Sequence, residues 1–106
     1  MTDGEYDGDP VIKIDWMAGN CPVQAEGTID GKPFYFRARH EHWSFHVGGD
    51  VISRPEWGIR ERYSDEEYAA GWMTQYEALG FIAHAVGLYA KHRDETLSTD
   101  APTGDK

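Results

Sequence analysis

The sequence predicts an α+β fold, a four- to five-stranded antiparallel meander with one C-terminal helix packed on one face. Three observations support this prediction. Apolar and polar residues alternate through residues 22–48, and the alternation returns over residues 56–63. Tight-turn residues interrupt the first stretch, which indicates hairpins. An apolar stripe with helical spacing then follows a capping sequence at Thr74.

The first expected strand covers residues 11–17. Its alternation places Ile12, Ile14 and Trp16 on one side of the strand. The dipeptide Gly19-Asn20 follows, and turn-forming residues of this kind mark the end of a strand.

Two hairpins are expected between residues 22 and 48. A two-residue turn at Asp30-Gly31 sets the first register, which pairs Glu26 with Tyr35, Ala25 with Phe36, Gln24 with Arg37 and Val23 with Ala38. A second turn at Glu41-His42 sets the next register, which pairs Ala38 with Phe45, Arg37 with His46 and Phe36 with Val47.

Both registers divide the side chains into the same two faces, because alternate residues of a strand point to opposite sides of a sheet. The apolar face, which the helix can cover, carries Val23, Ala25, Ile29, Phe34, Phe36, Ala38, Trp43, Phe45 and Val47. The polar face, which is left open, carries Gln24, Glu26, Tyr35, Arg37, Arg39, Ser44 and His46.

Residues 48–55 are expected to form a loop, and residues 56–63 a further strand. That strand places Trp57, Ile59 and Tyr63 on one side and Arg60 and Arg62 on the other. Residues 64–67 fit either a short helical turn or an exposed loop. Residues 68–73 favour a short extended segment that leads into the helix.

The helix is expected from Thr74 to about Arg93. Thr74 and Glu77 have the spacing of a capping box, in which each side chain satisfies a backbone amide of the other residue. The apolar stripe that faces the sheet consists of Ala78, Phe81, Ile82, Ala85, Val86 and Tyr89. The opposite face holds small residues, which fits either an exposed smooth surface or a homodimer packed through Gly80, Ala83 and Gly87.

Charge and composition set the domain limits and the compartment. The net charge is −9, and most of the acidic excess lies in residues 1–10 and 94–106, which we expect to be disordered tails around a single domain at 11–93. The one cysteine, Cys21, excludes an intramolecular disulfide within the chain. Without an apolar run of about 18 residues or a signal-peptide pattern, the chain is expected in the cytoplasm.

Two surface clusters are candidate partner-binding sites. The first lies on the polar sheet face, where Tyr35, Arg37, Arg39 and His46 combine guanidinium forks with a rigid aromatic ring. Arg60 and Arg62 would extend this surface if residues 56–63 form the next strand in phase. The second is the acidic run Asp65, Glu66 and Glu67. Each cluster also fits an ordinary solvated surface.

No catalytic motif, cofactor motif or converging metal ligands are recognisable, and we expect a protein that is not an enzyme. In the expected hairpin, His40 and His46 point to opposite faces and His42 lies in the turn, so these histidines do not form a metal site. The negative net charge also opposes direct binding to nucleic acid.

Four short sequence motifs, CPVQAEG, FYFRAR, PEW and AAGWM, are the basis of a resemblance to known proteins over residues 20–90. The chain resembles small uncharacterised proteins encoded by bacteriophages and prophages of proteobacteria, in which a glycine stands where this chain has His40. The resemblance implies an accessory protein that binds and blocks a host protein or nucleoprotein complex, as anti-CRISPR inhibitors do. The alternative is a small-molecule or phosphate-binding module that uses Arg37 and Arg39.

Overall fold

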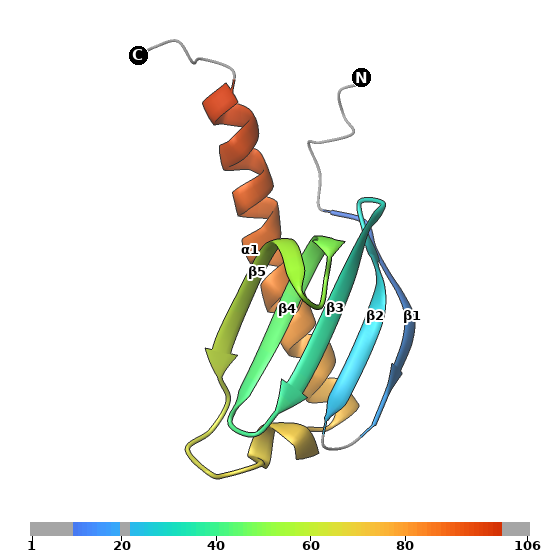
Figure 1. Cartoon of the computed structure of the whole chain (residues 1–106), viewed down its shortest axis with the longest axis vertical. Coiled ribbons are helices and arrows are strands. Elements are labelled where there is room, and N and C mark those ends of the chain that lie inside the picture. The colour runs from blue at the N-terminus through green and yellow to red at the C-terminus, as the bar shows by residue number, and fades with distance from the viewer. Residues whose placement is uncertain (1–9, 20–21, 101–106) are drawn as a thin grey trace.

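The chain forms one antiparallel sheet with a single long helix packed against one face, so the expected α+β fold is confirmed (Figure 1). The computed structural model describes residues 10–19 and 22–100, with side chains up to Glu95. Neighbours in the sheet follow the order β1-β2-β3-β4-β5. The elements are β1 (Ile12–Ala18), β2 (Val23–Ile29), β3 (Lys32–Arg39), β4 (His42–Asp50), β5 (Arg54–Arg62), the short 3₁₀-helix η2 (Ala69–Trp72) and α1 (Gln75–Asp100).

The first hairpin has the expected register. Val23 pairs with Ala38 and Glu26 with Tyr35 across β2 and β3. Asp30 and Gly31 both have positive φ, at 52° and 82°. These angles are those of a type I′ turn, whose twist matches that of the two flanking strands.

The second hairpin turns one residue earlier than expected, which corrects the predicted register by two residues. Ala38 pairs with Trp43 instead of Phe45, and Phe36 pairs with Phe45 instead of Val47. His40 takes the left-handed conformation with φ at 57°. The turn carbonyls are held by tertiary hydrogen bonds, from the Ala70 amide to His40 and from the Tyr63 amide to Glu41. A shift of two residues leaves every side chain on its expected face.

The predicted face of Trp16 is wrong, because β1 is irregular. The register of β1 against β2 shifts between Ile14 and Trp16, as in a β-bulge, where an extra residue reverses the side to which later side chains point. Trp16 is therefore 42% exposed, whereas Met17 packs against the core.

Three element boundaries also differ from the prediction. β5 begins at Arg54, so the expected loop at 48–55 shortens to a turn in which the Asp50 carboxylate accepts hydrogen bonds from the amides of Ile52 and Ser53. Residues 69–72 form a 3₁₀-helix rather than an extended segment. Helix α1 continues to Asp100, past the expected end at about Arg93. The other parts of the predicted tails, 1–9 and 101–106, and Cys21 lie outside the described residues.

The capping box of α1 is confirmed in both directions. The Glu77 amide donates to Thr74 Oγ1 at 3.0 Å, and the Thr74 amide donates to Glu77 Oε1 at 2.9 Å. At the other end of the helix, Arg93 donates to Asp30 Oδ2 at 2.8 Å, and both side chains are largely buried. Burial lowers the pKa of Arg93, but its hydrogen bonds to Asp30 and Asp94 outweigh this and raise it. The helix is thus held at its start by a cap and near its end by an ion pair.

The core lies between α1 and the apolar face of the sheet. Trp43 is 1% exposed and packs against Phe81 of the helix, with ring centroids 5.1 Å apart and ring planes tilted by 31°. All nine residues predicted for the apolar sheet face are buried. Because the helix covers this face, the polar face of the sheet is left open (Figure 1). Within the described residues, no helix combines the length and apolar character that a membrane span requires.

Candidate functional site

The open face of the sheet carries a compact group of cationic residues, which strand pairing arranges in two rows. Arg37 of β3 lies beside Ser44 of β4, which lies beside Arg60 of β5. One step along the strands, a second row runs Arg39, His42 and Arg62. We call these six residues the arginine cluster. Their even spacing on three adjacent antiparallel strands places all six side chains on one face.

A depression of about 320 Å³ lies within the arginine cluster. Its lining includes Arg37, Arg39, His42, Ser44 and Arg60. Ser44 is the small residue of its row and stands between two long arginine side chains. The short hydroxymethyl group therefore leaves space that a larger side chain at this position would fill.

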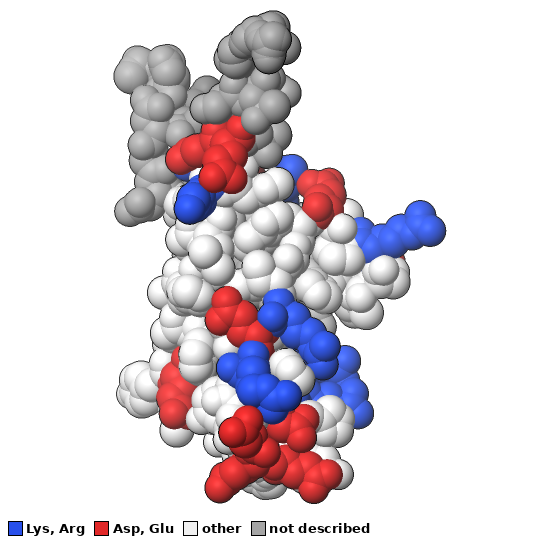
Figure 2. Space-filling model, turned by 90° about the vertical axis from the view of Figure 1, so that its left-hand side faces the viewer, with Lys and Arg blue, Asp and Glu red and all other residues white. Residues whose placement is uncertain are grey.

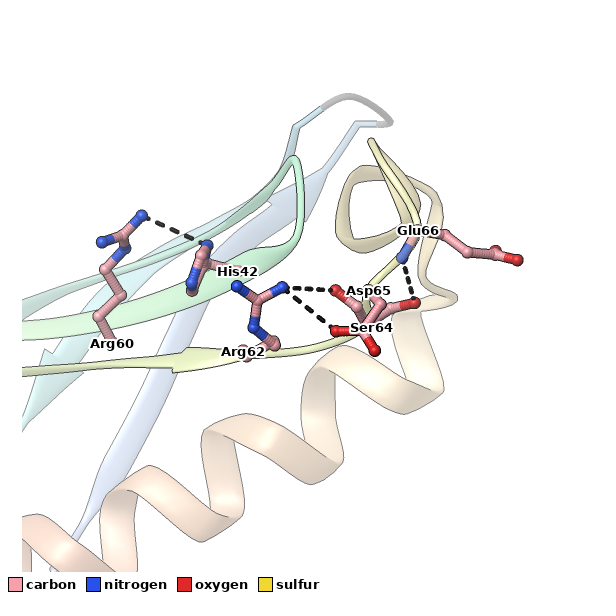
Figure 3. Close-up of polar contacts among 6 residues, drawn as sticks. All are labelled: His42, Arg60, Arg62, Ser64, Asp65 and Glu66. Carbon is pink, nitrogen blue, oxygen red and sulfur yellow. Dashed lines mark hydrogen bonds and ion pairs between the residues drawn. The ribbon is translucent and has the colours of Figure 1, made fainter.

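The arginines differ in the partners they have. Arg60 Nη2 lies 3.3 Å from His42 Nδ1, and Arg62 Nη1 lies 3.4 Å from the Ser64 carbonyl oxygen and 3.5 Å from Asp65 Oδ1 (Figure 3). The pair Arg62–Asp65 is exposed and long, so it contributes little stability. Neither Arg37 nor Arg39 forms an ion pair with any residue that the structure describes.

Arg37 also has a buried donor without a partner. Its Nε atom is shielded from solvent and makes no hydrogen bond within the described part of the chain. A buried donor that is left unsatisfied costs about 1–3 kcal/mol. The fold therefore buries the Nε atom of Arg37 without giving it a partner among the described residues.

Tyr35 and His46, which were predicted as contact residues, lie in the adjoining row and outside the lining of the depression. The Tyr35 side chain is largely buried, and its hydroxyl donates to Gln24 Oε1 at 2.6 Å. Burial raises the pKa of Tyr35, Arg37 opposes this rise and Glu26 adds to it. His46 Nδ1 is 2.6 Å from the Val51 carbonyl oxygen, so this nitrogen is the donor. Both side chains are thus engaged within the protein and support the face beside the cluster.

The acidic residues Asp65, Glu66 and Glu67 lie in the loop after β5, which ends at Arg62, and all three are exposed. Figure 2, which views the left-hand side of Figure 1, shows a group of Lys and Arg atoms directly above a group of Asp and Glu atoms. The Glu66 amide donates to Ser64 Oγ at 3.0 Å, and the Glu66 carboxylate points away from Arg62 (Figure 3). Basic and acidic patches therefore adjoin on this side of the molecule.

The structure corrects two histidine positions. His42 was expected in the turn, but it begins β4 on the open face and contacts Arg60. His40 was expected on a strand, facing away from His46, but it lies in the turn, with its ring centroid 5.3 Å from that of Tyr68. His46 is held by Val51. Across the described residues, no three His, Cys, Asp or Glu side chains gather in a way that could hold a metal ion.

The outer face of α1 is smooth, and the small residues on it are exposed. A Cβ added at Gly80 or Gly87 would meet nothing within 4 Å, and Ala83 is exposed between them. No backbone of the described chain therefore explains these glycines by close approach. The homodimer through Gly80, Ala83 and Gly87 stays a prediction.

Comparison with protein-family models, with curated proteins and with solved structures finds nothing that matches this chain. The arginine cluster itself is therefore the basis for assigning a function.

Proposed function

We propose that this protein is a non-enzymatic interaction protein that docks on a protein partner through the arginine cluster and the adjoining acidic loop. The observation that carries the proposal is the depression on the open sheet face, where the guanidinium groups of Arg37 and Arg39 have no ion-pair partner among the described residues. Arginine is enriched among the residues that dominate binding energy at protein interfaces.

The arrangement of charge favours a protein over a uniformly charged polymer as the partner. The acidic loop at Asp65, Glu66 and Glu67 lies next to the arginine cluster, with Arg62 and Asp65 as the point of contact. A polyanion would gain from the arginines but would be repelled by the loop. A protein surface of mixed charge can complement both patches, and such complementarity also fixes orientation.

The resemblance to proteins of phages and prophages makes a host defence complex the expected partner, and a CRISPR effector complex the first one to test. In this proposal the protein blocks its target by occupying a binding surface. The cluster lies on strands rather than on a loop, which keeps the backbone positions of its residues in a fixed arrangement.

Affinity capture tests the proposal. The tagged protein is incubated with lysates of proteobacteria that carry CRISPR effector complexes, and the captured proteins are identified by mass spectrometry. We expect a stoichiometric effector subunit with the wild type and its loss with Arg37→Glu/Arg39→Glu. Since Arg37 is partly buried, Arg39→Glu/Arg60→Glu serves as a second variant at exposed positions.

The matched control is Arg54→Glu/Lys91→Glu, which changes the net charge equally at exposed positions outside the cluster. Circular dichroism and the melting temperature confirm folding of every variant. Capture that survives both cluster variants in folded protein would show that the arginine cluster is not the docking surface. Asp65→Lys/Glu66→Lys tests the acidic loop in the same assay, and we expect it to weaken capture.

A further inference from the structure

The depression at Ser44 has the geometry of a site for a single anion. Arg37 and Arg60 flank Ser44 from the two neighbouring strands, so their Cα atoms lie about 10 Å apart, two strand spacings. Two long side chains can close over a gap of this width, and Arg39 reaches the same depression from the next row. Guanidinium groups from two strands thus surround one small residue.

Within the described residues, no ion pair neutralises the arginines that line the depression. Glu41 is the one carboxylate among the lining residues, and it forms no ion pair with any of the three arginines. Neighbouring cations repel each other, and a bound anion would remove this repulsion.

The number of donors favours phosphate over carboxylate. One arginine is enough to bind a carboxylate with two parallel hydrogen bonds. This depression offers three guanidinium groups and the Ser44 hydroxyl. Since arginine cannot accept a hydrogen bond, Nδ1 of His42 accepts from Arg60 and holds that guanidinium beside Ser44. A tetrahedral phosphate group presents more acceptor oxygens than a carboxylate, so it can use more of these donors at once.

We propose that the depression over Ser44 binds a phosphate group between the side chains of Arg37, Arg39 and Arg60. This inference rests on the proposed function, because it puts the anion at the centre of the same binding face. The phosphate comes either from free phosphate or from a phosphorylated small molecule, and both present the same oxygens to the guanidinium groups.

NMR titration of the ¹⁵N-labelled full chain tests the site directly, with inorganic phosphate, AMP and acetate as probes at constant pH and ionic strength. We expect saturable shifts at the backbone amides of Ser44 and its neighbours and at the Arg37 Nε–H resonance. Acetate should bind at least about tenfold more weakly than phosphate, which corresponds to the loss of one charge-assisted hydrogen bond. Tighter binding of AMP would identify a nucleotide-like source, and equal binding would identify free phosphate.

Arg60→Gln and Arg39→Gln should each weaken phosphate binding at least about tenfold, because each removes a charged donor at an exposed position. Arg54→Gln, an exposed arginine at the start of β5, is the matched control and should bind as the wild type does. The site is refuted if no probe gives saturable shifts, if acetate binds as tightly as phosphate, or if Arg54→Gln weakens binding as much as Arg60→Gln.

The two proposals fail in different ways. If the wild type binds phosphate but both charge-reversal variants still capture the partner, the anion site is retained and the docking role is removed. The absence of phosphate binding, together with loss of capture in those variants, would retain the docking face and overturn the anion site.

Discussion

At Gly27 the backbone of β1 lies close against β2, and replacement of this glycine by alanine tests the packing. Gly27 is buried, pairs with Ile14 of β1 and with Phe34 of β3, and lies beside the irregularity of β1. An added Cβ would overlap the carbonyl oxygen of Lys13 and would lie 2.9 Å from Phe34 Cε2. An ordinary carbon–oxygen contact is about 3.3 Å, so β1 would have to move away from β2.

We expect Gly27→Ala to destabilise the fold by about 1–3 kcal/mol, the usual cost of overpacking a core. The Phe34 ring can rotate, but the Lys13 carbonyl belongs to the backbone of a neighbouring strand and moves only if the strand moves. For a domain of this size each 1 kcal/mol lowers the melting temperature by about 4–8 °C. The expected decrease is therefore measurable by thermal melting and urea denaturation.

Gly80→Ala is the matched control, since it adds the same methyl group at an exposed helical position where nothing lies within 4 Å. Alanine is favoured over glycine in a helix by about 1 kcal/mol, so this variant should be more stable than the wild type. If Gly27→Ala lowers the stability and Gly80→Ala raises it, the same added methyl group has opposite effects, which supports the geometry at Gly27. A Gly27→Ala protein as stable as the wild type would refute the close approach of β1.

Two further predictions concern local hydrogen bonds. Thr74→Ala should cost about 1 kcal/mol in urea denaturation, because it removes the oxygen that accepts the Glu77 amide; an unchanged midpoint would mean that the cap contributes nothing. Asp50 accepts hydrogen bonds from the backbone and side chain of Ser53 and from the Ile52 amide, which lower its pKa. Its contribution to stability is therefore present above about pH 4 and is lost as the pH falls through the lowered value. Asp50→Asn should show a smaller decrease in melting temperature between pH 5 and pH 2 than the wild type, and equal decreases would contradict this assignment.

The first hairpin was predictable in full because its turn has a strong local signal. Asp-Gly tolerates positive φ at both turn positions, and only one pairing follows from a two-residue loop. The second turn lacks such a signal, because neither His40 nor Glu41 is a preferred turn residue in its position. Its place depends on hydrogen bonds from Ala70 and Tyr63, which are distant in sequence. Alternation alone could not distinguish two registers that keep the same faces.

The sequence pattern did not predict the irregularity in β1, nor did it predict the 3₁₀-helix η2. The physical reason is the same for both. A β-bulge depends on how two strands fit together, and the alternation of Ile12, Ile14 and Trp16 gives no local sign of it. The helix η2 is held by contacts with the second turn, where the Ala70 amide donates to His40. The cap at Thr74 needed no such context, since both of its residues lie within one turn of the helix.

The register of the second hairpin also decides what the candidate site is. In the predicted register, Arg37 would lie beside His46, whose imidazole is much larger than the side chain of Ser44. In the observed register Ser44 takes that place, and His46 lies beside Tyr35 and is held by Val51. The exchange of a ring for a hydroxymethyl group opens the depression, and it also brings His42 onto the face beside Arg60. That the arginines share one face could be predicted from alternation alone. The depression between them depends on the tertiary hydrogen bonds that fix the second turn.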